Sequence, residues 1–158
     1  NSTERLRIDA AGAVTMPHQP AFSAKVTSSI NNITAGGSTN TGIVFGTEIF
    51  DTNADYNTNG TFTAPVTGKY QLSMKLRLEN VDASTTLYSF YMRTSNRSYN
   101  TIFDPDYGGQ DMAYLYVNAS VLADMDAGDT SNIQYYIVGG ASQTDINVDS
   151  YFQGILVA

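Results

Sequence analysis

Three carboxylates fall within one short stretch rich in Gly and Pro, residues 104–111. They belong to Asp104, Asp106 and Asp111. Calcium takes several oxygen ligands from flexible loops, and Asp-x-Asp spacing together with backbone carbonyls can supply them. The stretch lacks the order of acidic residues and the terminal Glu of an EF-hand. The pattern favours turns in which each Asp caps its own backbone, and the alternative is a calcium site at these three residues.

The longer segment 98–110 carries side chains of the kind that bind sugars. Its aromatic rings offer flat apolar faces, and its amides and carboxyls offer hydrogen-bonding groups. A loop of this length indicates function as well as connection. The alternative is a loop that packs on a neighbouring subunit, and the polar stretch 51–59 is a second candidate surface. The candidate ligand-binding residues in the first segment are Tyr99, Asn100, Phe103, Asp104, Asp106, Tyr107 and Gln110.

Catalytic chemistry is not indicated. The single histidine, His18, lies between Pro17 and Gln19, and as a general base it would need a nucleophile and an orienting acid. The chain has no cysteine and no Gly-x-Ser-x-Gly elbow. A glycosidase needs two carboxyls at a defined separation, which the sequence does not show. We therefore expect His18 to be a solvated linker residue and the protein not to be an enzyme.

Composition excludes several classes of partner. The 158 residues, 17.1 kDa, suffice for one domain with a sizeable core. A net charge of −7 and a pI near 4.3 would repel phosphates, so nucleic acid is not an expected partner. There is no cysteine for a disulfide, and no apolar run has the length of a membrane-spanning helix. The chain opens without Met, and we expect it to be part of a longer protein.

The elements that must position these groups are strands. In 68–78 apolar residues alternate with polar ones, which predicts a half-buried antiparallel strand. Turn-forming pairs such as Asn59-Gly60 separate such runs. Many short strands with polar turns predict an all-β fold, a sandwich or jelly roll. The other expected strands are 22–26, 43–50, 87–93, 112–122, 133–138 and 151–157.

The segment 1–16 has a different pattern from the rest of the chain. Residues 5–9 alternate, Ala11-Gly12 can turn, and residues 14–16 can return as a second strand. Pro17 and Pro20 then form a stiff boundary. Two such short strands do not fold alone. We expect this segment to pair with copies of itself, with the main domain or with upstream chain.

Four motifs in order carry a family resemblance. They are Pro20-Ala21-Phe22-Ser23-Ala24, the run from Phe62 to Tyr70 with Pro65 and Gly68, Gly128-Asp129, and Phe152-Gln153-Gly154-Ile155-Leu156. Residues 17–158 resemble the C1q-like domain of the C1q/TNF superfamily. The resemblance implies a jelly-roll β-sandwich that assembles as a homotrimer, with calcium on the three-fold axis in some relatives. It places Phe22, Phe62, Tyr70, Tyr151 and Phe152 in the core or on the trimer axis.

A second resemblance covers about a dozen residues. The segment from Thr3 to Val14 is similar to one that precedes the terminal domains of bacteriophage tail fibres. Together the two imply the trimeric head of a virion tail fibre, binding a host-surface glycan or outer-membrane protein, with no membrane insertion. One alternative is a purely structural cap that trimerises and terminates the fibre. Another is a secreted, extracellular C1q-like lectin or adhesin.

Overall fold

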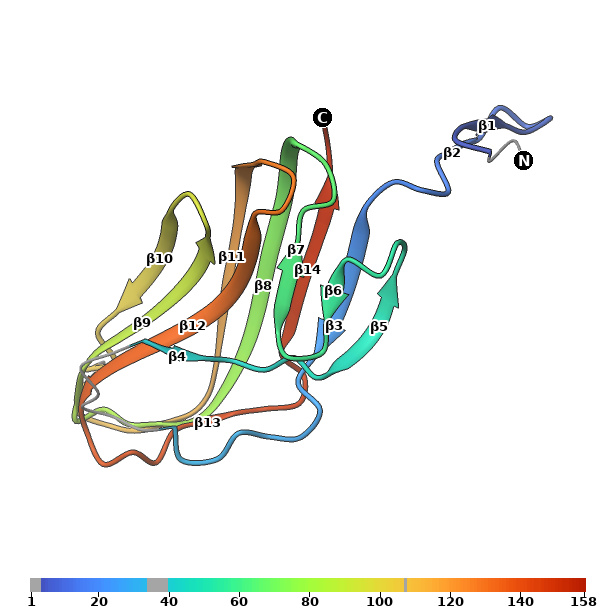
Figure 1. Cartoon of the computed structure of the whole chain (residues 1–158). Coiled ribbons are helices and arrows are strands. Elements are labelled where there is room, and N and C mark those ends of the chain that lie inside the picture. The colour runs from blue at the N-terminus through green and yellow to red at the C-terminus, as the bar shows by residue number, and fades with distance from the viewer. Residues whose placement is uncertain (1–3, 34–39, 107) are drawn as a thin grey trace.

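The computed structural model describes residues 4–33, 40–106 and 108–158, and every regular element within them is a strand. Two sheets pack face to face as a sandwich, and a separate two-stranded hairpin precedes them (Figure 1). All strand pairs are antiparallel. The all-β sandwich predicted from the alternation is therefore confirmed.

We name each sheet after a central strand. The β8 sheet runs in the order β11 (Met112–Met125), β8 (Gly68–Val81), β14 (Tyr151–Leu156), β3 (Ala21–Lys25), β5 (Thr47–Asp51), and β13 (Asp145–Ile146) also pairs with β8. The β12 sheet runs in the order β10 (Ser98–Phe103), β9 (Thr85–Thr94), β12 (Thr130–Gly139), β7 (Thr61–Thr63), β6 (Tyr56–Asn57), and β4 (Thr41–Gly42) also pairs with β12. The hairpin is β1 (Arg7–Ile8) and β2 (Val14–Thr15). Six of the predicted strands are thus present, with shifted ends.

An aromatic cluster fills one half of the core. The Phe22 ring lies 4.7 Å from Phe62, 4.9 Å from Tyr56 and 4.9 Å from Phe152, measured between centroids. Gly154 lies beside it, and a Cβ at that position would come within 2.5 Å of the Phe22 ring. The Phe-x-Gly-x-Leu motif therefore has a packing reason, because the glycine makes room for Phe22.

The prediction of one strand over 43–50 is wrong. β4 ends at Gly42 in the β12 sheet, and β5 begins at Thr47 in the β8 sheet. Between them the chain crosses from one sheet to the other, with Ile43 and Phe45 buried in the core and Val44 exposed. A crossing segment that alternates core and solvent positions has the same pattern as a strand.

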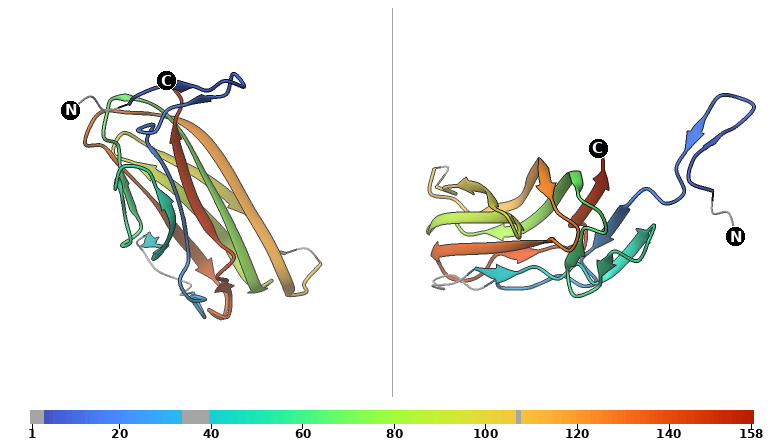
Figure 2. Two further views of the ribbon diagram at one scale, coloured as in Figure 1. Left: turned by 90° about the vertical axis from the view of Figure 1, so that its right-hand side faces the viewer. Right: turned by 45° about the horizontal axis from the view of Figure 1, so that its top comes forward.

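The two ends of the sandwich differ. We call the end that carries the N-terminal linker and the C-terminus the proximal end. There the Leu156 N–H donates to the Pro20 carbonyl, and the Gln19 amide donates to the Leu156 carbonyl. The opposite end, which we call the distal end, carries the loops 82–84, 104–111 and 140–144, seen at the bottom of Figure 1. Figure 1 and the right-hand view of Figure 2 show the hairpin standing away from both sheets, beyond the proximal end.

Candidate functional site

The distal loops form one connected surface. Ala83 N–H donates to Asp111 at 2.9 Å, and the Gln143 amide donates to the other Asp111 oxygen at 2.8 Å. These contacts join the loops 82–84, 104–111 and 140–144, which are far apart in the sequence. Asp111 therefore holds the distal loops together.

Asp104 and Asp106 cap the turns of their own loop. The Asp104 carboxylate accepts the N–H of Asp106, and the Asp106 carboxylate accepts the N–H of Gly109, each at 3.0 Å. Gly108 and Gly109 have φ angles of 81° and 69°, which glycine adopts at no steric cost. This is the geometry that capped turns require, and both carboxylates remain exposed.

The predicted binding segment is not one loop. Residues 98–103 form β10, an edge strand of the β12 sheet, so Tyr99 and Asn100 are separated from the distal loop. Phe103 is stacked on Tyr88 with centroids 5.0 Å apart, and its ring belongs to the sandwich. Tyr107 lies outside the described residues. Gln110 is exposed in the distal loop, and Asn100 is exposed on β10.

Asp82 is a buried carboxylate at this end that sequence reasoning missed. It is 4% exposed and accepts the N–H and hydroxyl of Ser84 and the N–H of Ala141. Burial by itself raises the pKa of Asp82, but the hydrogen bonds from Ser84 and Ala141 outweigh it, and the pKa lies below its usual 3.8. Gly140, with φ of 83°, brings the chain so close that a Cβ there would lie 2.7 Å from the carboxylate.

We expect Asp82→Asn to lower the free energy of unfolding by about 1–3 kcal/mol at neutral pH, because buried donors lose a charged acceptor. The folded-state pKa lies below the unfolded-state value, so this stabilisation is complete above about pH 4 and disappears as the pH falls through the folded pKa. Urea unfolding of both proteins at pH 7 and at pH 3 measures the difference. An equal difference at both values would contradict the assignment.

The outward face of the β8 sheet carries large exposed apolar and aromatic side chains. On β11, Tyr114, Tyr116 and Leu122 are 65%, 47% and 59% exposed, and Ile155 on β14 is 46% exposed. Phe50 on β5 is 51% exposed. It is paired with Ser23, Ser23 with Gln153, and Gln153 with Ser73, so Phe50 lies on the same outward face of the sheet as Ser73. On strands of the β12 sheet, by contrast, Ile102 is the one large hydrophobic residue among the exposed described ones. An apolar patch of this breadth marks an interaction surface.

Basic side chains lie close to these aromatic rings. The Lys75 ammonium lies 4.9 Å from the Tyr116 ring centroid and 5.7 Å from that of Tyr151. Arg77 lies 5.3 Å from the Tyr114 ring and forms ion pairs with Glu79 and Asp149. Aromatic faces attract such cations more strongly when water is removed. The basic groups therefore fit a face that becomes covered.

The family comparison accounts for this architecture. The family model of the C1q domain matches residues 21–157, which is most of the chain. The chain belongs to the C1q domain family. No sequence among the curated proteins matches it.

Solved structures show the same C1q/TNF jelly roll. The globular domain of zebrafish complement 1qA protein superimposes with a TM-score of 0.64 at 18% identity, covering 89% of this chain and 98% of that one. Murine APRIL superimposes with a TM-score of 0.61 at 9% identity, covering 88% and 99%. Domains of this family form homotrimers and are generally binding or structural modules rather than enzymes.

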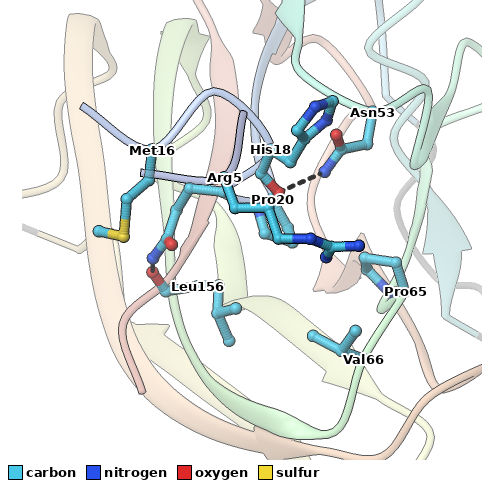
Figure 3. A pocket seen from close by; sticks show the side chains of 9 residues that line it. Arg5, Met16, His18, Pro20, Asn53, Pro65, Val66 and Leu156 are labelled. Atoms are coloured by element: carbon cyan, nitrogen blue, oxygen red, sulfur yellow. Dashed lines mark hydrogen bonds between the residues drawn. The ribbon is translucent and has the colours of Figure 1, made fainter. Parts of the chain in front are cut away.

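At the base of this C1q domain a pocket of about 490 Å³ lies between the N-terminal segment and the sandwich (Figure 3). The lining residues include Arg5, Met16 and His18 from the N-terminal segment and Val66 and Leu156 from the rest of the domain. His18 is exposed, and its carbonyl accepts the Asn53 amide at 3.1 Å. Among the described residues that line this pocket there is no Asp, Glu, Ser or Thr. That His18 is a solvated linker residue without a catalytic role stays a prediction.

The residues assigned to the core or trimer axis divide into two groups. Tyr151 is half-buried on the outward face of the β8 sheet, paired with Lys25 on one side and Lys75 on the other. The other four are almost fully buried between the sheets: Phe22, Phe62, Tyr70 and Phe152.

In the described residues, no group of three or more His, Asp or Glu side chains is arranged to hold a metal ion. The calcium site at Asp104, Asp106 and Asp111 stays a prediction. In the same part of the chain, no helix has the length and hydropathy to cross a membrane.

Proposed function

We propose that this C1q domain is the homotrimeric, non-enzymatic head of a phage-type tail fibre, and that its distal loops bind a glycan or protein on the host surface. The observation that carries the proposal is that the two ends of the domain carry different features. The hairpin and the C-terminus lie at the proximal end, and the exposed polar loops lie at the opposite end. A head attached to a fibre through its base would present the distal loops outward.

Trimer formation is supported by the outward face of the β8 sheet. Its exposed Tyr, Leu, Ile and Phe side chains would be covered by neighbouring subunits, as closed three-fold assemblies cover such faces. Three distal surfaces would then point the same way, and weak binding at each would be strengthened by avidity. Proteins with C1q domains are typically extracellular, which fits a fibre tip.

A purely structural cap is the second candidate, and one observation favours it. The Phe103 ring, expected to serve as a sugar platform, is half-buried and stacks on Tyr88 of the sandwich, which leaves the described part of the distal surface mostly polar. A cap needs the trimer face and the base but no receptor contacts.

A secreted lectin or adhesin is the third candidate, and the sequence upstream of residue 1 would separate it from a fibre.

Binding to host cells tests the proposal. Fluorescently labelled protein should bind a glycan array or whole cells of a bacterial host panel, and Gln110→Ala should weaken that binding about tenfold or more if Gln110 contacts the receptor. Gln134→Ala, on the β12 sheet away from the distal end, is the matched control and should bind normally. Absence of binding to every glycan and cell type, by a protein that is trimeric, would favour the cap.

A further inference from the structure

The N-terminal hairpin has a well-defined turn. Gly12 N–H donates to the Asp9 carbonyl, and the Asp9 carboxylate accepts the N–H groups of Ala11 and Ala13, each at 2.9 Å. Gly12 has φ of 86°, as the last residue of a three-residue hairpin loop requires. The sequence therefore specifies this hairpin locally.

One face of the hairpin is apolar and uncovered. Ile8 is directly paired with Val14, so both side chains lie on one face, and they are 65% and 56% exposed. Leu6 and Met16, each one residue outside the paired strands, continue the same alternation as Ile8 and Val14 and are 56% and 48% exposed. Arg7 and Thr15 form the next pair and lie on the opposite face. Four large apolar side chains on so small an element indicate that something packs against them.

The sandwich leaves most of this face exposed: Met16 lines the pocket at the base with Val66 and Leu156, but Leu6, Ile8 and Val14 are not among the described residues that line it. β1 and β2 pair with each other and with no strand of either sheet. A two-stranded hairpin is at best marginally stable alone in water. The linker 17–20 reaches at most about 14 Å, and it is fixed to the base by Gln19. In a trimer, three such hairpins would be held close together at the proximal end.

Charge also favours association between copies. The described hairpin segment carries Glu4 and Asp9 against Arg5 and Arg7, a net charge of zero, whereas the whole chain carries −7. Three hairpins can therefore meet without the repulsion that other surfaces of the chain would bring.

We propose that the apolar face of the hairpin, formed by Leu6, Ile8, Val14 and Met16, packs against the same face of two further copies of this chain. The three hairpins form a collar that closes the base of the head. This inference rests on the proposed trimer. The collar covers apolar side chains that the sandwich leaves in water, and it would align three chains where the fibre meets the head.

Cysteine cross-linking tests the collar, because the chain contains no cysteine of its own. In Val14→Cys the new thiols face the three-fold axis, and mild oxidation should give a disulfide-linked dimer in most trimers, with the third chain unpaired. Thr15→Cys, one residue along on the opposite face, is the matched control and should remain monomeric on a non-reducing gel. Ile8→Cys should behave like Val14→Cys.

The outcomes separate the collar from the trimer. Light scattering on each reduced variant first establishes that the particle is a trimer. If trimeric Val14→Cys and Ile8→Cys do not cross-link, or if Thr15→Cys cross-links as well as they do, the collar is wrong while the trimer stands. A wild-type monomer would overturn both proposals.

Discussion

Replacing Leu122 by glutamate is expected to convert the trimer into single chains at micromolar concentration. Leu122 is 59% exposed on β11, in the row that runs through Gln71 to Ile155 across the β8 sheet. If neighbouring subunits cover this face, the variant buries one unpaired carboxylate in each subunit, and each costs several kcal/mol. Size-exclusion chromatography with light scattering should show the mass falling from about three times 17.1 kDa to that of one chain.

Ile102→Glu is the matched control. Ile102 is 56% exposed, nearly as much as Leu122, but it lies on β10 of the other sheet and pairs with Ser89. It should remain trimeric and keep the circular dichroism spectrum of the parent. If Ile102→Glu dissociates the particle and Leu122→Glu does not, the interface lies on the other face of the sandwich.

Phe22→Ala should cause the largest loss of stability. Phe22 is 1% exposed, and its ring contacts Tyr56, Phe62 and Phe152. Truncating a buried Phe costs about 3–5 kcal/mol, because apolar contact is lost and a cavity remains. Denaturant unfolding at one fixed chain concentration measures the loss, since the stability of a trimer depends on concentration.

Two further variants show whether the loss comes from packing. Phe22→Leu fills part of the space and should lose less than Phe22→Ala. Ile102→Ala removes an exposed side chain and should change the free energy of unfolding by about 0.5 kcal/mol or less. A Phe22→Ala protein as stable as the parent would mean that the aromatic cluster can close around the missing ring.

Most of the sandwich can be predicted from period-2 alternation. The segment 68–78 places Tyr70, Leu72 and Met74 on one face, and in β8 these residues are buried. The hairpin was predictable for a similar reason, since Ala11-Gly12 can turn between two alternating runs, and Gly12 has the positive φ of such a turn. Local pattern and turn chemistry specify these elements without tertiary information.

The sequence predictions are wrong or incomplete where contacts between residues distant in the sequence determine the structure. A crossing between sheets over 43–46 alternates as a strand does, so periodicity could not separate the two. The segment 98–103 has exposed residues at alternate positions because β10 is an edge strand, and the sequence suggested a loop. Asp82 was missed because its donors come from residues 84 and 141, and the second is distant in the sequence.

The sequence contains a pattern from which the exposed apolar face of the β8 sheet could have been predicted. In the predicted strand 112–122, one alternating set contains Val117 and the other contains Tyr116 and Leu122, so neither face is purely polar. A strand with apolar residues on both faces is covered on both sides. In this domain one side packs on the core, and the second side is the proposed subunit interface.

The mass of the wild-type particle tests the central claim most directly. Light scattering on the full 158-residue chain at micromolar concentration should give about three times 17.1 kDa, unchanged on dilution through that range. A stable particle of 17.1 kDa, folded and monodisperse, would contradict the trimeric head and the interface assigned to the β8 sheet.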